Sequence, residues 1–144
     1  MSGHPRVIGY LQRAVNHEFS AAQQFTLQAV LAESWRLPEL ADELRSAARE
    51  ELVHAEEFIR RLVEMGVTPG AGQLRAPLVG RSQAELLRHG LATEVEAVRL
   101  YREAGRFCEG IGDVTHYALF ARILNDEQQH QGDLERRLLT LGAG

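Results

Sequence analysis

Apolar residues recur at three- and four-residue steps over four long stretches of the chain, which predicts four amphipathic helices. We expect these helices over residues 5–35, 38–65, 82–110 and 113–141. Pro38 suits the first position of a helix, and Gly66 suits the turn that follows one. Ser82 and Glu85 form a capping box at the start of the third helix, and Asp113 is a good N-cap for the fourth.

The lengths of the loops predict how the helices connect. Short links near residues 36–37 and 110–112 indicate antiparallel neighbours, whereas residues 66–82 form a long loop rich in glycine and proline. The second and third helices are each about 39 Å long at ~1.5 Å per residue, and this loop reaches about 56 Å when extended. It can therefore cross the bundle and leave helices two and three parallel. The predicted fold is all-α, a four-helix bundle with one long crossover between helices two and three, formed by residues 1–144 as a single domain.

Two equivalent sets of potential metal ligands repeat along the chain. Residues 11–62 align without gaps on residues 87–138, and in both segments a lone glutamate precedes a Glu-x-x-His motif by the same interval. The two sets are Glu18, Glu51 and His54, and Glu94, Glu127 and His130. A glutamate from each of two helices, with Glu-x-x-His from each of two others, is the ligand set of a di-iron carboxylate site in a helix bundle.

These glutamates lie in the apolar stripes, where solvated charges are not expected. Glu18, for example, falls between Val15 and Ala22, and the other three occupy similar positions. Four uncompensated buried carboxylates would be very unfavourable, but two divalent cations would neutralise them. Carboxylate and imidazole together suit iron, manganese or zinc. A single Glu-x-x-His is usually a surface pair, but that interpretation does not explain two in equal register.

Further carboxylates lie one turn before each ligand histidine, at Glu50 and Asp126. Such a group can accept the outer ring N–H of a metal-bound histidine and fix its tautomer. The sequence leaves open whether each carboxylate serves its own helix or the neighbouring one. The remaining histidines share no such pattern and are expected at the surface: His4, His17, His89 and His116.

Composition limits the compartment and the partners. Cys108 is the only cysteine, so no internal disulfide forms, which suits a reducing cytoplasm. No apolar run approaches the ~20 residues that span a bilayer, and charged residues interrupt the N-terminus before a signal peptide could form. Acidic and basic residues are interspersed at a net charge of −4, which argues against nucleic acid as a partner. We therefore expect a cytoplasmic protein without membrane or nucleic-acid partners.

The chain resembles bacterioferritin, a member of the ferritin-like superfamily, over nearly its whole length. The similarity rests on the six ligand positions, on Trp35 at the end of the first helix, and on the segment from Ile123 to His130. It implies that a dinuclear site oxidises Fe(II) with dioxygen or peroxide, and that iron is stored in a large closed shell. Glu51 and Glu127 are central on the two Glu-x-x-His helices and would bridge the two ions. Glu18, Glu94 and both histidines would be terminal ligands.

Three features depart from the family's pattern. Leu52 stands where the family usually has a methionine that binds haem between two subunits, so no haem is expected. Phe25 replaces the family's redox-active tyrosine, and Tyr101 holds the equivalent position in the second half of the chain. Tyr101 is thus either a redox replacement or a core aromatic residue. The sequence ends at Gly144 without the family's fifth helix, which casts doubt on the closed shell but not on a homodimer.

Two other functions remain open besides a bacterioferritin-type ferroxidase. The protein could be a small dimeric di-metal oxidase or peroxide scavenger without a storage shell. It could instead be a haem-free structural subunit in a mixed shell whose other subunit brings the methionine. The particle size separates the first alternative from a shell-forming ferroxidase.

Overall fold

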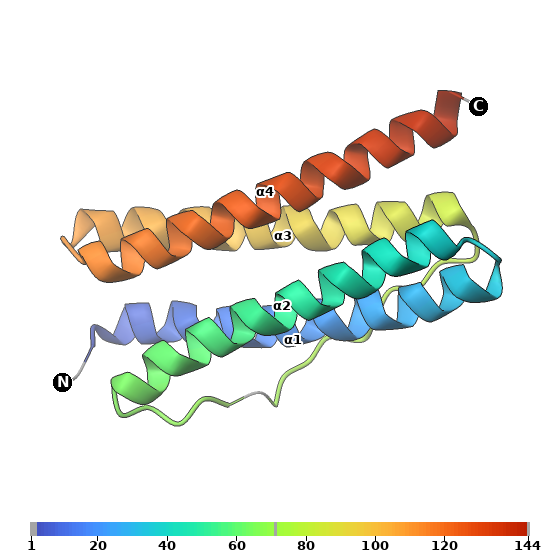
Figure 1. Cartoon of the computed structure of the whole chain (residues 1–144). Coiled ribbons are helices and arrows are strands. Elements are labelled where there is room, and N and C mark those ends of the chain that lie inside the picture. Colours follow the sequence, from blue (N-terminus) through green and yellow to red (C-terminus); the bar gives the residue numbers. More distant parts are fainter. Residues whose placement is uncertain (1–2, 71, 144) are drawn as a thin grey trace.

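The computed structural model describes residues 3–70 and 72–143, and over these residues the chain forms four helices and no strand (Figure 1). The helices are α1 Pro5–Ser34, α2 Pro38–Glu64, α3 Gln83–Gly110 and α4 Val114–Ala143. Their bounds agree with the sequence prediction to within two residues or so, which is the usual uncertainty of a helix end. None of the helices in the described part is long and apolar enough to cross a membrane.

Three of the helices end in the same left-handed turn. Gly66 after α2 has φ 76° and Gly112 after α3 has φ 74°, which glycine adopts without steric cost. After α1 the left-handed residue is Arg36, with φ 62°, although a residue with a Cβ is sterically disfavoured in this conformation. In each turn a backbone N–H reaches back five residues, as from Leu37 to the Ala32 carbonyl at 2.9 Å. These bonds satisfy carbonyls that the helix end leaves without partners.

The bundle consists of two antiparallel hairpins, α1 with α2 and α3 with α4, that pack together through α1 and α3 (Figure 1). The segment between α2 and α3 runs from one end of the bundle to the other. This crossover makes α2 and α3 parallel, as the loop length predicts. The predicted all-α four-helix bundle with one crossover is confirmed.

A strip of polar residues on α1 holds the crossover loop against the bundle. The backbone N–H of Arg75 donates to Ser20 Oγ at 3.0 Å, and that of Leu78 donates to Gln24 Oε1 at 3.1 Å. Gln28 Nε2 donates to the Leu78 carbonyl at 3.0 Å. All three α1 side chains are buried, because the loop covers them. Their amide and hydroxyl groups satisfy loop backbone that would otherwise be buried without partners.

Two apolar clusters lie on either side of the middle of the bundle. One contains Phe58, Tyr101 and Phe120, and the other contains Phe25 and Leu87. Each of these side chains is at most 1% exposed, and burial of one such group stabilises the fold by roughly 1.5–3 kcal/mol. The clusters therefore hold the four helices in register around the polar layer that separates them.

The prediction that His17 and His116 lie at the surface is wrong. His17 is 4% exposed, with its Nδ1 3.0 Å from the guanidinium of Arg75 on the crossover loop. His116 is 6% exposed and lies 2.7 Å from the Asp113 carboxylate and 3.3 Å from Arg61 on α2. Helical periodicity did not reveal this burial, because Arg75 and Arg61 come from distant parts of the chain.

Candidate metal centre

All six predicted ligands meet in the polar layer between the two apolar clusters. Four helices supply them, with α1 and α3 each giving one glutamate and α2 and α4 each giving a Glu-x-x-His pair. The four glutamates are at most 1% exposed. The His54 side chain is 3% exposed and that of His130 is 17% exposed, so the second half of the site is more open. A cavity of about 1050 Å³ between α2 and α4 reaches this half at Glu94 and His130.

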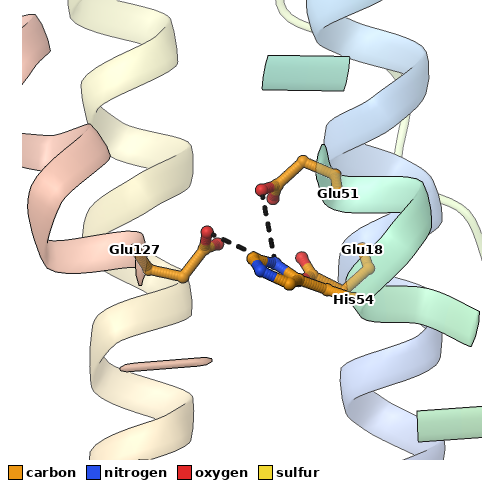
Figure 2. Close-up of side chains that lie close together, drawn as sticks. All are labelled: Glu18, Glu51, His54 and Glu127. Carbon is orange, nitrogen blue, oxygen red and sulfur yellow. Dashed lines mark hydrogen bonds and ion pairs between the residues drawn. The ribbon is translucent and has the colours of Figure 1, made fainter. Parts of the chain in front are cut away.

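The first half of the site surrounds His54 (Figure 2). Its Nδ1 lies 2.8 Å from Glu18 Oε1, and it lies 3.7 Å from Oε1 of both Glu51 and Glu127. One ligand atom from each of these four residues lies within 4.8 Å of every other. This spacing can hold a single cation.

The second half surrounds His130 in the same manner. Its Nδ1 lies 3.2 Å from Glu127 Oε1, 3.7 Å from Glu51 Oε1 and 3.9 Å from Glu94 Oε2. These four residues again place ligand atoms within 4.8 Å of one another. Glu51 and Glu127 belong to both halves, whereas Glu18 and Glu94 each belong to one.

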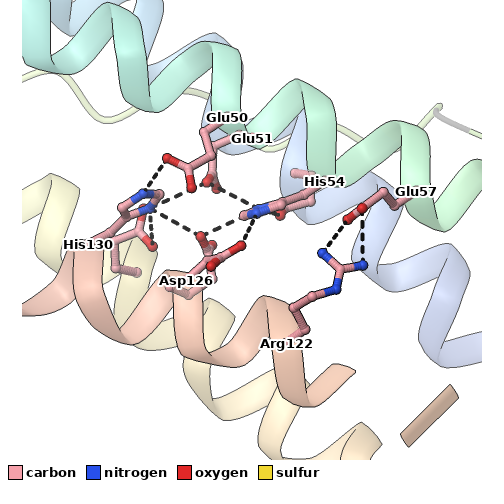
Figure 3. Close-up of polar contacts among 10 residues, drawn as sticks. Glu50, Glu51, His54, Glu57, Arg122, Asp126 and His130 are labelled. Atoms are coloured by element: carbon pink, nitrogen blue, oxygen red, sulfur yellow. Dashed lines mark hydrogen bonds and ion pairs between the residues drawn. The ribbon is translucent and has the colours of Figure 1, made fainter. Parts of the chain in front are cut away.

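The outer nitrogens of the two histidines bind carboxylates of the opposite helix (Figure 3). His54 Nε2 of α2 lies 3.0 Å from Asp126 Oδ2 of α4, and His130 Nε2 of α4 lies 2.8 Å from Glu50 Oε2 of α2. The question that the sequence left open is thereby answered, because each carboxylate serves the neighbouring helix. An Nε2–H that donates to a carboxylate leaves the Nδ1 lone pair directed into the site.

Comparison with known proteins shows the family to which the chain belongs. The model of the ferritin-like domain family matches residues 8–141. This chain belongs to the ferritin-like family. It is 32% identical over 138 residues to bacterioferritin of Rhodobacter capsulatus, covering 96% of this chain and 86% of that protein. It is 31% identical over 140 residues to a bacterial ferritin of Neisseria meningitidis serogroup B, covering 96% of this chain and 90% of that one.

A solved structure shares the bundle of this ferritin-like chain closely. It is the Rhodobacter capsulatus bacterioferritin, described as having a metal-free dinuclear site and a haem iron. The two structures agree with a TM-score of 0.96 at 31% identity, over 99% of this chain and 89% of that one. The family similarity that the ligand pattern indicated is confirmed.

When no cation is bound, the electrostatics of this ferritin-like site favour the protonated form of its carboxyl groups. Burial, followed by the charges of neighbouring carboxylates, raises the pKa of Glu18, Glu51 and Glu94 well above the usual range. Burial opposes ionisation of Glu127 too, but the close approach of the His130 and Glu51 side chains and the charges of the two histidines lower its pKa. In three of the four carboxyls the metal-free site therefore favours the protonated form over the charged one.

Buried atoms without partners provide a direct test of whether metal ions fit this site. Within the described part of the chain, both oxygens of Glu51, Glu94 and Glu127 have no hydrogen-bond partner, and neither has Nδ1 of His130. Buried polar atoms in folded proteins almost always have one. The atoms in question are the ones that would bind cations, and carboxylate with imidazole suits iron, manganese or zinc. The residues therefore fit a pair of divalent ions.

The aromatic residues Phe25 and Tyr101, which hold equivalent positions in the two halves of the chain, lie in different surroundings. Tyr101 is 0% exposed and packs against Phe58 and Phe120, with ring centroids 5.4 and 6.1 Å away. Burial, followed by the charges of Glu18 and the other three site carboxylates, raises the pKa of this phenol well above its usual range. Its hydroxyl has no hydrogen bond of good geometry among the described residues. Phe25 lies farther along the bundle, in the other apolar cluster.

Proposed function

We propose that this chain is an iron-storage protein of the bacterioferritin type that oxidises Fe(II) to Fe(III) at a dinuclear site. The observation that carries the proposal is the pair of four-residue ligand groups that share Glu51 and Glu127. Glu51 and Glu127 would be shared by the two ions, Glu18 and His54 would complete the first site, and Glu94 and His130 would complete the second. Residues 1–144 would form one such domain, in a reducing cytoplasm.

The side chains prepare the site for two cations in three ways. Four carboxylates neutralise two divalent ions, which removes the charge repulsion that raises their pKa in the metal-free protein. The cross-helix bonds from Asp126 and Glu50 hold both histidines with Nδ1 inward. Because the glutamates bind metal only as carboxylates, loading releases protons and becomes stronger as the pH rises.

Fe(II) and either dioxygen or peroxide are the proposed substrates. Two Fe(II) ions supply two electrons, which is sufficient to reduce one peroxide to two waters, whereas full reduction of dioxygen requires four. We propose that Tyr101, whose phenol is fully buried, supplies the third of these four electrons and that a further Fe(II) substrate ion supplies the fourth, with the protons of the two waters coming from Tyr101 and the solvent. Manganese or zinc can occupy the same donor set, but zinc would supply no electrons.

An exposed apolar face on α1 and α2 supports the proposal of a homodimer. The exposed apolar side chains of this face are Leu27 and Val30 on α1 and Leu52 and Val53 on α2, which are between 39% and 59% exposed. Leucine offers no lone pair to iron, so we expect no bis-methionine haem in the homo-oligomer. Exposed apolar groups of this size often mark an interface. The same face is available in a larger shell or in a mixed one.

Iron titration of purified protein tests the proposal. Metal-free protein should bind about two Fe(II) per chain without oxygen, and exposure to oxygen or peroxide should convert them to Fe(III). Glu127→Ala combined with His130→Ala should reduce the stoichiometry, whereas Glu135→Ala, an exposed position on the same helix, should not. Unchanged binding in the double variant would refute the assignment of the ligands. Light scattering on the same samples separates a dimer from a shell.

A further inference from the structure

The outer face of α3 carries a row of arginines without counter-ions. The row consists of Arg99, Arg102 and Arg106, which occupy positions i, i+3 and i+7 of the helix. All three are exposed, and none has a hydrogen-bond or ion-pair partner in residues 3–70 and 72–143. Two acidic residues of the same helix pair with arginines elsewhere. Glu96 lies 3.6 Å from Arg75 on the crossover loop, and Glu103 lies 3.6 Å from Arg13 on α1. The three guanidinium groups therefore remain free to bind an anion.

These arginines border a hollow of about 670 Å³. Arg6, from the start of α1, adds a fourth guanidinium to its wall. The position of Arg6 is fixed, because its guanidinium carbon lies 4.4 Å from the centre of the Phe107 ring and Nη2 donates to the Tyr10 hydroxyl at 3.3 Å. Glu103 is the one acidic residue in the lining, so the hollow carries a net positive charge. Its volume lies within the range typical of small-ligand sites, ~300–1000 Å³.

The arrangement of the guanidinium groups determines which anion fits. Arginine binds phosphate oxygens through pairs of parallel N–H donors. Arg99 and Arg106 are separated by about 10.5 Å along the helix at ~1.5 Å per residue, so the row suits an extended anion with several charged groups. Arg6 already covers one face of Phe107, and His4 packs edge-on against the same ring at 5.1 Å. The wall therefore offers charge along its length but little open aromatic surface for a base to stack on.

We propose that the hollow bounded by Arg6, Arg99, Arg102 and Arg106 is a binding site for a small polyphosphate anion. An inorganic oligophosphate and the phosphate tail of a nucleotide share this chemistry. The site lies on the outside of α1 and α3 and uses none of the metal ligands. It is therefore independent of the proposed oxidation of iron.

Calorimetric titration of the full-length protein with tripolyphosphate, ATP and orthophosphate tests the proposal. Tripolyphosphate and ATP should bind with similar affinity, orthophosphate about tenfold or more weakly, and higher salt should weaken all three. Arg102→Gln combined with Arg106→Gln should weaken tripolyphosphate binding by about tenfold or more. The matched control is Arg49→Gln combined with Arg88→Gln, two other exposed arginines, and it should bind as the wild type does.

The same measurements identify the outcomes that would overturn the proposal. An equal loss in the control pair would show that binding depends on general charge. Binding of ATP but not tripolyphosphate would show that the base, not the phosphate chain, is recognised. Much tighter binding of a single-stranded oligonucleotide would assign the face to nucleic acid, and a changed particle mass in the Arg102/Arg106 variant would assign it to subunit contact. Glu127→Ala with His130→Ala should leave anion binding intact, so failure of the iron site is distinguishable.

Discussion

Replacing Glu51 by glutamine should stabilise the metal-free protein while it weakens metal binding. Glu51 is 0% exposed, and neither of its oxygens has a hydrogen-bond partner among the described residues. Burial, followed by the charges of Glu18 and Glu127, raises the pKa of this carboxyl. Glutamine has nearly the same shape, carries no charge and can donate a hydrogen bond to a neighbouring carboxylate. The substitution therefore removes a buried like-charge repulsion.

The size of the effect follows from the protons that the folded state retains. A carboxyl whose pKa is raised in the folded state stabilises it fully below its ordinary value of 4.5, and this contribution is lost as the pH rises towards the raised pKa. Each retained proton makes the free energy of unfolding fall by about 1.4 kcal/mol per pH unit. His17 acts in the opposite direction, since its pKa is lowered from 6.5 to about 4, but only below pH 6.5. His130, whose pKa is raised, adds to the fall above that value.

Thermal unfolding in the presence of a chelator, followed by circular dichroism at pH 6.5, 7.5 and 8.5, measures this loss. At about 2–4 °C per kcal/mol for a chain of this size, wild-type protein should lose about 3–6 °C in Tm per pH unit for each proton retained. Glu51→Gln should melt higher than wild type at pH 8.5 and show a shallower slope. Glu56→Gln, an exposed position on the same helix, is the matched control and should follow the wild type.

Added divalent metal should reverse the order of the two proteins, because it stabilises only the protein whose ligand set is complete. Two results would refute the reasoning. One is a wild-type Tm that rises with pH over this range in chelator. The other is a Glu51→Gln variant that melts below the wild type at pH 8.5 without metal.

Four further predictions concern other positions. Asp126→Asn should lower metal affinity about 10–100-fold with little effect on stability, because the hydrogen bond between Asp126 and His54 Nε2, which orients the imidazole, weakens. Metal titration against a chelating dye measures the affinity, and an unchanged value would argue against a positioning role for Asp126. Tyr101→Phe should slow oxidation of iron by dioxygen in stopped-flow measurements while iron binding stays the same, and wild-type kinetics would make Tyr101 a core aromatic only. Arg36→Gly should raise stability by about 1 kcal/mol in urea unfolding, because φ 62° is strained for a residue with a Cβ. Leu52→Met should allow haem to bind between two copies of the chain, which the absorbance of the haem would detect. A dimer of the variant that binds no haem would show that the two copies do not place their residues 52 opposite each other.

The sequence by itself determined the helices and the candidate ligands, because both depend on short-range spacing. The sequence predicts Ser82 as the cap of the third helix, and its Oγ accepts a hydrogen bond from the Glu85 N–H at 3.2 Å. The reciprocal bond of the capping box differs, since the Glu85 carboxylate accepts from the N–H of Arg81 rather than that of Ser82. Residues three apart on a helix face the same way, so Glu-x-x-His pairs within apolar stripes indicated an inward site without knowledge of the partner helices. The crossover followed from loop length alone.

Only the tertiary structure decided which groups lie opposite one another. It assigned Asp126 to His54 and Glu50 to His130, across the bundle rather than along each helix. It also buried His17 beneath the crossover loop. Helical periodicity fixes the face on which a side chain lies, but it contains no information on what a distant segment places against that face. These contacts depend on the packing of α2 against α4 and of the loop against α1, which join residues far apart in the chain.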